Sequence, residues 1–519
     1  MRQSGSEMKA RHDGRRVFRV LSALCGGYFL WVLGVVVFGQ TAYAAAYQTN
    51  MLASNLLLLP FVLLLLLGLW AIPARTGGPL KFDIRSNGAL AGWFAALLIV
   101  QLLVAHSLWF YPGWDVESVY QAAFALAESG AVEKEYFALC PNNAALAMLL
   151  SVPLTVAARL GKDVPYTVLV YLSELLVNLS CLLAMLCVRT LTKSRAAWMG
   201  ALLLCTGWIA LSLIATVPYT DSFAVLFPVL ALYVYLRKKL PPFAKWLLIA
   251  FICFAGSAIK PTALILLLAM ALVLGVRTLL TGALRTGWKR VLVIITALAL
   301  GAAGGILLQR AAVAYMSGEV VPQAQLSETH YLMLGMNGDS LGGHTDADVA
   351  YSTSFATLSE RRQASLARAW ERLSSRSFAE NLTFFSAKLY KAFGDGTMAQ
   401  SKSFLVMEQP ARTGWWAALL QQVYFTDGRY NALFQTVQQV FWLFILLLMP
   451  VAMFGKSGNQ KVTAVLAVTL TGLGMYLMLF EVWPRYLYLY SPVFVVLAAI
   501  GIDTLRRRVS RWWPRRTSG

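Results

Sequence analysis

Residues 90–120 read LAGWFAALLIVQLLVAHSLWFYPGWDVESVY. The first part, Leu90–Phe110, is apolar over roughly 20 residues, which is the length that an α-helix needs to cross the hydrocarbon core of a bilayer. The part that follows is short, polar and rich in aromatic side chains. Its two carboxylates, Asp115 and Glu117, sit where the chain leaves the apolar run. The stretch therefore predicts a membrane span that is followed directly by a short acidic segment.

An acidic side chain at the end of an apolar helix is costly unless it is solvated, paired or used in the function. Local sequence gives Asp115 two explanations. It caps a helix that begins near Val116, because Asp is a good N-cap residue, or it is a functional carboxylate. Both explanations remain open on this stretch alone.

Composition extends the membrane prediction to the whole chain. Of 519 residues, 58% are hydrophobic and only 13% are charged, and the mean hydropathy is +0.63. A soluble domain cannot bury so much apolar surface, so the expected fold is an all-α polytopic transmembrane bundle. The net charge is +20, but the basic residues cluster in the two tails and in short connections, as in the positive-inside pattern, and we expect no nucleic-acid partner. Six cysteines show neither a disulfide framework nor a metal-ligand spacing.

The N-terminal run resembles a signal peptide but is too long for one. Sixteen polar and basic residues precede an apolar run from Val17 to Ala46, whereas the hydrophobic part of a signal peptide has about 7–15 residues. We expect an uncleaved first span with the N-terminus in the cytoplasm. A second span at Leu52–Ile72 is followed by Arg75, Lys81 and Arg85, which return the chain to the cytoplasmic side.

The remaining apolar runs lie at 144–158, 166–188, 196–217, 221–236, 245–258, 261–276, 291–312, 435–454, 462–480 and 486–502. If 144–158 and 166–188 both cross the membrane, the basic connection Arg189–Arg195 lies on the outer side, against the positive-inside rule. Either one segment crosses only halfway, or 245–276 counts as one span. We favour two short segments paired around Lys260, because a charge followed by Pro261 is less costly at the outer boundary than at the bilayer centre. Both solutions give about twelve spans with both termini inside.

Three regions follow from this topology. Residues 1–312 form an N-terminal transmembrane module with an outer loop at 111–143. Residues 313–433 contain no run long enough to span and form a large extracytoplasmic region, in which 358–373 reads as an Arg-rich amphipathic helix. Residues 434–519 form the closing spans and a basic cytoplasmic tail.

Polar groups from distant parts of the chain then share one face of the membrane. They are Asp115, Pro141-Asn-Asn143, Tyr219-Thr-Asp221, Lys260, Glu481 and Arg485. A carboxylate there can deprotonate an acceptor hydroxyl as a general base, and Arg and Lys can hold a phosphate. Simpler roles stay open for the others, since Arg485 and Lys260 also suit helix-end anchors and Asp221 suits a helix start.

The order of Tyr-Pro-Gly-Trp-Asp115, Pro-Asn-Asn143, Lys260-Pro-Thr262 and Glu481-x-x-x-Arg485-Tyr486 resembles bacterial integral-membrane glycosyltransferases of the GT-C superfamily. Residues His330-x-x-x-x-Gly335-x-Asn337, Gly342-Gly343, Asp346 and Gly394-Asp-Gly-Thr397 resemble a subgroup common in Gram-positive bacteria. The resemblance covers most of the chain. It departs from the family in the first loop, where the usual pair of acids is only Asp-x-Glu and Cys140 precedes the Pro-Asn-Asn motif.

The resemblance implies an inverting transfer of a sugar from a polyprenyl-phosphate donor at the outer face of a bacterial plasma membrane. Asp115 would be the general base, with Glu117 as the weaker candidate, and Arg485 and Lys260 would contact the donor phosphate. The Gly-rich part of the large loop would close over the sugar. The expected substrate-binding residues are Asn142, Asn143, Tyr219, Asp221, His330, Asn337, Asp346, Glu481 and Tyr486. The expected acceptor is a cell-envelope glycan, glycolipid or protein, in contact with membrane lipids.

We expect no cofactor and no bound metal. His330, His344 and the nearby acids match no compact ligand motif, and a divalent cation is not indicated. No GxxxxGK[ST] loop for ATP is present. Two alternatives remain: a lipid-linked glycan flippase or transporter, which would predict charges near the membrane midplane and an internal repeat, and a glycopolymer polymerase or ligase that uses a diphosphate-linked oligosaccharide.

Overall fold

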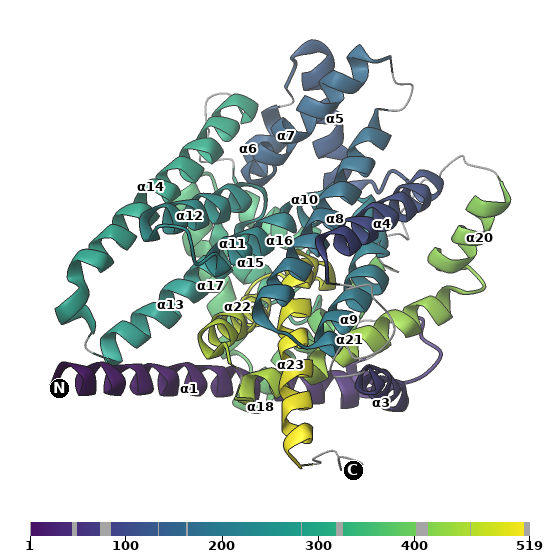
Figure 1. Ribbon diagram of the computed structural model, residues 1–519. Helices are drawn as coiled ribbons and strands as arrows, with labels where there is room; N and C mark the ends of the chain where they lie inside the picture. Colours follow the sequence, from purple (N-terminus) through teal and green to yellow (C-terminus); the bar gives the residue numbers. More distant parts are fainter. Residues whose placement is uncertain are drawn as a thin grey trace.

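The structure is a computed structural model, and it describes residues 2–43, 49–72, 85–132, 134–161, 165–281, 283–317, 325–400, 414–456 and 458–512. Four sequence predictions fall partly outside these ranges: the end of the first span at 44–46, the basic residues Arg75 and Lys81, parts of the large region 313–433 (318–324 and 401–413), and the end of the C-terminal tail. All the elements that the structure assigns in the described ranges are helices. The predicted all-α transmembrane fold is confirmed (Figure 1).

Ten helices are long and apolar enough to cross a membrane, counted in the described ranges. They are Gly14–Phe38 of α1 (Arg2–Phe38), α4 (Asn87–Leu108), Pro141–Arg159 with α7 (Ala144–Arg159), α8 (Tyr166–Leu191), α12 (Pro242–Ile259), Pro261–Leu280 with α13 (Ile265–Leu280), Gly287–Met316 of α14 (Ala283–Ser317), α21 (Asn431–Phe454), α22 (Gln460–Leu479) and Pro484–Ser510 with α23 (Ser491–Trp512). Three shorter apolar helices are α3 (Asn55–Ala71), Arg195–Ala210 with α9 (Arg195–Leu204), and Thr220–Leu236 with α10 (Thr220–Ala224) and α11 (Leu226–Leu236).

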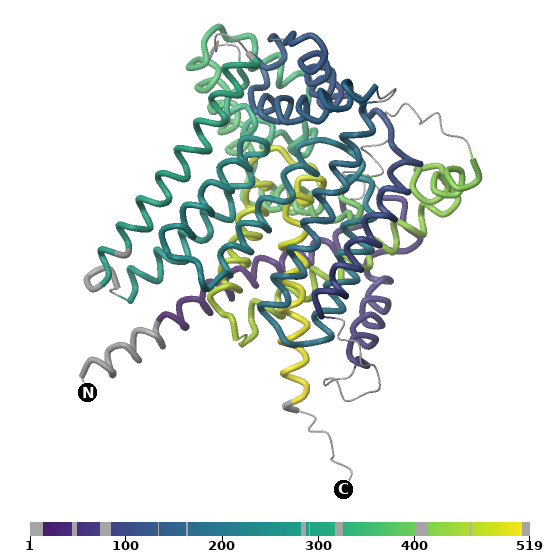
Figure 2. The backbone as a smooth tube through the Cα atoms, turned by 45° about the horizontal axis from the view of Figure 1, so that its top comes forward, coloured from purple at the N-terminus to yellow at the C-terminus, as the bar shows by residue number. Residues whose placement is uncertain are grey.

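The bundle has two chemically different ends. At one end, the Arg85 guanidinium donates to the carbonyl of Lys193 at 3.1 Å, and Asn459 donates to the carbonyl of Leu191 at 2.6 Å. These contacts bring three connections with basic residues to the same end. The described end of α23 (yellow) also lies toward this end, at the bottom of Figure 2, whereas the blue segment that follows α4 lies at the top. The opposite end carries the predicted outer loop.

Helix α7 does not reach the basic end. Its start, next to Asn143, and the start of α8, at Tyr166, both lie beside the outer loop, because Asn143 bonds Tyr136 and the Tyr166 and Tyr111 rings lie 4.7 Å apart. The six residue steps from Leu160 to Tyr166 span at most about 20 Å, whereas the 26 residues of α8 extend about 39 Å. Figure 1 shows α5, α6 and α7 together at one end.

This placement decides between the two topologies that the sequence allowed. Segment 144–158 is the one that does not cross, and the paired segments on either side of Lys260 are separate helices, α12 and α13. Within the described ranges, the other nine long helices and the three shorter ones add up to twelve apolar segments that could cross. The number agrees with the predicted value of about twelve.

The predicted span 196–217 is a broken helix. After α9 the chain continues as a π-helical turn at Cys205–Ala210 (η2) and a 3-10 turn at Leu213–Thr216 (η3). The carbonyls that the break exposes are paired with side chains: Ser173 to Ala215 O at 2.7 Å, Tyr488 to Ile209 O at 3.0 Å and Tyr424 to Leu211 O at 3.1 Å. Irregular backbone at membrane depth is tolerated when protein groups satisfy it in this way.

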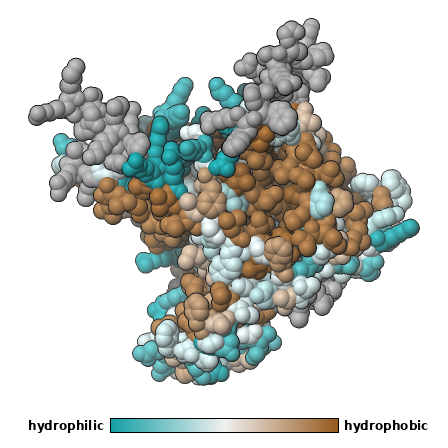
Figure 3. Space-filling model, turned by 90° about the horizontal axis from the view of Figure 1, so that it is seen from below, coloured by the Kyte–Doolittle hydropathy of each residue, from teal (hydrophilic) through white to brown (hydrophobic). Residues whose placement is uncertain are grey.

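The surface of the bundle is apolar over a broad area. Figure 3 shows hydrophobic atoms across the middle of the view, with hydrophilic atoms gathered at opposite margins. Large apolar side chains are exposed on outer helices, for example Leu57, Phe61 and Leu64 of α3 and Leu268 and Leu272 of α13. Lipid chains would cover such a surface, so the chain is a multi-pass membrane protein.

The large region between α14 and α21 is itself helical. It contains α15 (Glu328–Gly335), α16 (Asp346–Thr353), α17 (Leu358–Ser374), α18 (Phe378–Phe393) and α20 (Trp415–Tyr424). Helices α17 and α18 begin with capping boxes, in which Thr357 pairs with Glu360 and Ser377 with Glu380. In the described parts of this region, α15 packs against α16 and α17, whereas α20 packs against α4 and α21.

Candidate functional site

Asp115 lies in the first turn of α5 (Trp114–Ser129), and its side chain is exposed. The N-cap of this helix is Gly113, with φ of +66°, rather than Asp115. The carboxylate instead accepts hydrogen bonds from the hydroxyl of Tyr136 at 3.0 Å and from that of Tyr219 at 3.3 Å. Asp115 is thus held by side chains of two distant segments and is open to solvent.

The tyrosine hydroxyls also bind Asn143. Its amide donates to the Tyr136 oxygen at 2.6 Å, and its carbonyl oxygen accepts from Tyr219 at 3.4 Å. Asn142 donates to Asn143 at 3.2 Å. Burial, followed by the charge of Asp115, raises the pKa of Tyr136 and raises that of Cys140 to about 12. Tyr136 is therefore a hydrogen-bond donor to Asp115 at neutral pH.

A cluster of charges lies beside this network. Asp221, at the start of α10, forms an ion pair with Lys260 and a second with Arg485, the latter at 3.5 Å. All three side chains are largely buried: the exposed fraction is 4% for Asp221, 10% for Lys260 and 17% for Arg485. We call Asp221, Lys260 and Arg485 the charged cluster. A helix cap or a membrane anchor would be more exposed than these residues are.

Aromatic rings surround the two cations. The guanidinium carbon of Arg485 lies 4.3 Å from the ring centre of Trp114, 5.4 Å from that of Tyr486 and 5.7 Å from that of Tyr219. The Lys260 ammonium lies 4.4 Å from the Tyr486 ring. Cation–π contacts of this kind stabilise charged groups that are removed from water. Tyr219 contacts both Asp115 and Arg485, so it joins the carboxylate to the charged cluster.

Glu481 and Tyr331 complete the surroundings of the site. Glu481 is half-buried and interacts electrostatically with Lys260 and Arg485. Burial raises the pKa of Tyr331, on α15, and the electrostatic influence of Cys140, Glu481 and Asp115 raises it further. The large outer region therefore contributes a side chain to the site.

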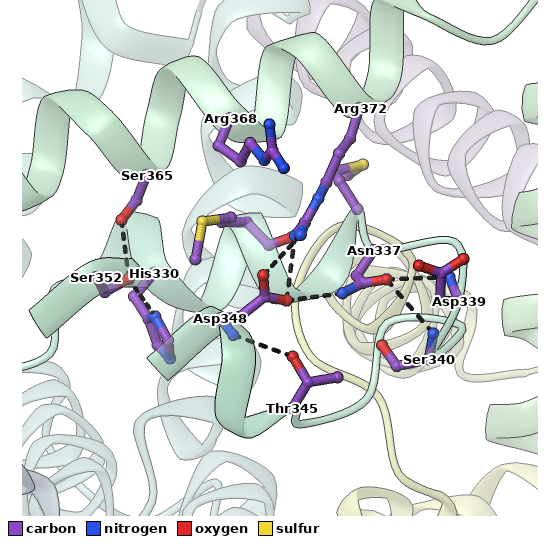
Figure 4. Close-up of polar contacts among 12 residues, drawn as sticks. His330, Asn337, Asp339, Ser340, Thr345, Asp348, Ser352, Ser365, Arg368 and Arg372 are labelled. Atoms are coloured by element: carbon purple, nitrogen blue, oxygen red, sulfur yellow. Dashed lines mark hydrogen bonds and ion pairs between the residues drawn. The ribbon is translucent and has the colours of Figure 1, made fainter. Parts of the chain in front are cut away.

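Other predicted site residues form a separate network, shown in Figure 4. Asn337 donates to Asp348 at 2.8 Å, and Arg372 donates to the same carboxylate at 2.6 Å. His330 pairs with Ser352 at 2.7 Å. Burial opposes ionisation of Asp348, but the hydrogen bonds from Arg372 and Asn337 outweigh it and lower its pKa. This network joins α15, α16 and α17.

Two predicted residues take no part in either network. Asp346 is exposed in the first turn of α16, whereas Asp348, two residues further on, forms the hydrogen bonds with Asn337 and Arg372. Glu117 is exposed on α5, away from the hydrogen bonds of Asp115. No group of three or more His, Cys, Asp or Glu side chains suited to a metal ion occurs in the part of the chain that the structure describes. Metal independence stays a prediction.

Several site residues were missed by sequence reasoning. Trp114 stands inside the quoted acidic stretch, and its aromatic character was the available signal. Tyr136 lies in a segment with no motif, and Tyr331 is an unspecified position of the pattern that begins at His330. Glu174 was also missed: it is buried in α8, with Gln101 of α4 donating to it at 2.7 Å. An acid inside a long apolar run is itself a signal.

Comparison with known proteins identifies a family that the chain matches. Residues 20–505 match the model of a family described as conserved hypothetical integral membrane protein. The description states a membrane location and names no activity. The curated proteins gave no significant match, and the solved structures gave none either.

Proposed function

The chain belongs to a family of conserved hypothetical integral membrane proteins, and on that premise we propose that it is an inverting glycosyltransferase. It would move a sugar from a polyprenyl-phosphate donor to a cell-envelope glycan, glycolipid or protein at the outer face of a bacterial plasma membrane. One observation carries the proposal. Tyr219 hydrogen-bonds Asp115 and packs against Arg485, so an open carboxylate and a pair of buried cations share one site. The resemblance to GT-C glycosyltransferases supports the same assignment.

The charges of the site favour a donor with one phosphate. Lys260 and Arg485 bring two positive charges and Asp221 one negative charge, which leaves the charged cluster with a net charge of +1. A sugar linked to polyprenol through one phosphate is a diester with a single negative charge. A diphosphate link would bring a second negative charge close to Glu481, and burying an uncompensated charge is costly. This argument disfavours a polymerase or ligase that uses diphosphate-linked oligosaccharides.

The reaction would proceed by direct displacement. The acceptor oxygen attacks the anomeric carbon while its proton passes to Asp115. The bond between the anomeric carbon and the phosphate oxygen breaks, and the phosphate leaves with the electron pair as a monoester. Negative charge grows on the phosphate in this step, so Lys260 and Arg485 stabilise the transition state more than the bound donor.

The orientation of the site follows from the positive-inside rule. The end that carries Arg85, Arg189 and Lys193 would face the cytoplasm, and both termini would lie on the same side of the membrane. Asp115 and the charged cluster lie toward the other end. The acceptor would therefore be outside the cell.

The test is sugar transfer in membranes that contain the full-length protein, supplied with radiolabelled polyprenyl-phosphate sugars and native acceptor lipids. Asp115→Asn keeps the size of the side chain but removes its basicity, and we expect turnover to fall by about 10²–10⁴-fold. Donor binding should persist. Glu128→Gln is the matched control, because Glu128 is an exposed acid on the same helix, outside the site.

The outcomes separate the candidate functions. Equal transfer by wild type and Asp115→Asn would remove Asp115 as the base and direct the search to Glu117. Transport is the second candidate, and the buried Glu174 is the observation that favours it. Translocation of a lipid-linked glycan that Glu174→Gln abolishes, without label transfer by the wild type, would replace the glycosyltransferase proposal.

A further inference from the structure

Two lysines of α18 reach from the outer region to the segment that leads into Arg485. Lys388 is fully buried, and its ammonium donates to the carbonyls of Gly335 at 2.5 Å and Phe480 at 2.8 Å. Lys391 is also buried and donates to the carbonyl of Ser340 at 2.9 Å. Its ammonium lies 4.7 Å from the ring centre of Trp483. We call Lys388 and Lys391 the lysine pair.

Glycines make room for the lysine pair. A Cβ atom on Gly342 would lie 2.7 Å from the Lys388 ammonium, and one on Gly343 would lie 2.7 Å from that of Lys391. Gly342 also has φ of +70°, a conformation that favours glycine. A Cβ on Gly335 would collide with the backbone of Leu479 and Phe480. The Gly-rich stretch is therefore packed against the segment that leads into Arg485, and its closure over a sugar stays a prediction.

The backbone of the last outer segment is tied to the same stretch. The amide of Val482 donates to the carbonyl of Gly342 at 2.8 Å. Pro484 and Arg485 follow within three residues, at the start of a short helical turn, η5 (Pro484–Tyr490). A shift of residues 480–483 would therefore move the guanidinium of the charged cluster.

Burial of the lysine pair at this position is energetically unfavourable. A buried ammonium costs free energy unless it is hydrogen-bonded, and the acceptors of Lys388 are neutral carbonyls. Burial lowers the pKa of Lys388 well below its usual value, and the neighbouring charges of Lys391 and Arg376 lower it further, against a smaller effect of Glu481. An apolar side chain of similar size would pack there at lower cost.

We propose that Lys388 and Lys391 are positioning residues, which hold segment 480–483 against the Gly-rich stretch and thereby fix Arg485 for binding of the donor phosphate. The position of Arg485 at the phosphate site then depends on contacts with the outer region. The identity of the ligand rests on the proposed function. The positioning itself does not, because it concerns contacts within the chain.

The experiment uses the full-length protein in lipid nanodiscs, with farnesyl phosphate as the ligand. Lys388→Met keeps the length of the side chain and removes its hydrogen-bond donors. We expect faster hydrogen exchange at the Val482 amide and about ten-fold weaker binding of farnesyl phosphate. Lys388→Arg should restore part of the exchange protection at Val482 and part of the affinity for farnesyl phosphate. Lys134→Met is the control, because Lys134 is exposed on α6 (Lys134–Leu139).

A role in positioning also predicts a split in the transfer kinetics. The KM for the donor should rise in Lys388→Met while the KM for the acceptor stays unchanged, a pattern that general destabilisation does not produce. Lys391→Met carries the test if Lys388→Met fails to fold. Unchanged exchange at 480–486 in both variants would overturn the proposal. Faster exchange in a protein whose wild type binds no farnesyl phosphate would support the positioning and contradict the proposed function.

Discussion

His330 is uncharged at neutral pH, because burial lowers its pKa to about 4. Its Nδ1 atom pairs with Ser352, and its Nε2 atom is buried with no hydrogen-bond partner among the described residues. Protonation would place a charge on this group inside the layer formed by α15, α16 and α17. Since the unfolded chain binds the proton near pH 6.5, the unfolded state gains protons first as the pH falls.

The stabilising contribution of neutral His330 is therefore present above pH 6.5 and is lost between pH 6.5 and pH 4. We expect the free energy of unfolding of the outer region to fall by about 2 kcal/mol between pH 7 and pH 5. Thermal unfolding over this range, followed by hydrogen exchange in α15, measures the effect. His330→Asn should flatten the dependence, whereas His344→Asn should not, because His344 is exposed. An equal slope in wild type and His330→Asn would show that another group titrates.

At the scale of elements, a buried polar pair joins α4 to α8. Gln101 and Glu174 are 1% and 2% exposed, and they lie in apolar helices. Gln101→Leu would leave the Glu174 carboxyl without its amide donor in a place where water cannot replace it. We expect a loss of about 1–3 kcal/mol, measured by thermal unfolding of the purified protein.

The matched control for this pair is Gln363→Leu, on the exposed face of α17. The double variant Gln101→Leu/Glu174→Leu removes both polar groups and should recover part of the stability, because no buried group is then left unpaired. A Gln101→Leu protein that unfolds like the wild type would mean that Glu174 is satisfied by another group.

At the scale of the whole molecule, the topology gives a test of which helices cross the membrane. Leu160, after α7, should lie on the same side as Glu128, and Lys193 and Lys239 should lie on the other. Single cysteines at these exposed positions, in a Cys140→Ser background, are labelled with a membrane-impermeant maleimide in intact cells. We expect reaction at 128 and 160, and reaction at 193 and 239 only after permeabilisation. Labelling of position 160 together with 193 would mean that α7 crosses.

The sequence alone predicted most of the architecture. Apolar runs gave the positions of the spans, and Lys260-Pro261 marked the boundary between α12 and α13. These features are local, because a helix that spans lipid must satisfy its own backbone and present apolar side chains along its whole length. The same reasoning grouped Asp115, Asn143, Asp221, Lys260 and Arg485 at one end, which is how the structure places them.

The partners of these groups were decided by tertiary structure. Length and hydropathy do not distinguish α7 from a crossing helix, since the difference lies in where its neighbours place its two ends. The choice of Asp348 over Asp346 depends on which face of α16 packs against Arg372, and the burial of the Gly-rich stretch depends on lysines about fifty residues away. The sequence by itself determined a multi-pass helical membrane protein with polar groups gathered at one end, because hydropathy acts residue by residue. Only the folded chain determined which charges neutralise one another, because ion pairs and hydrogen bonds form between segments that are remote in sequence.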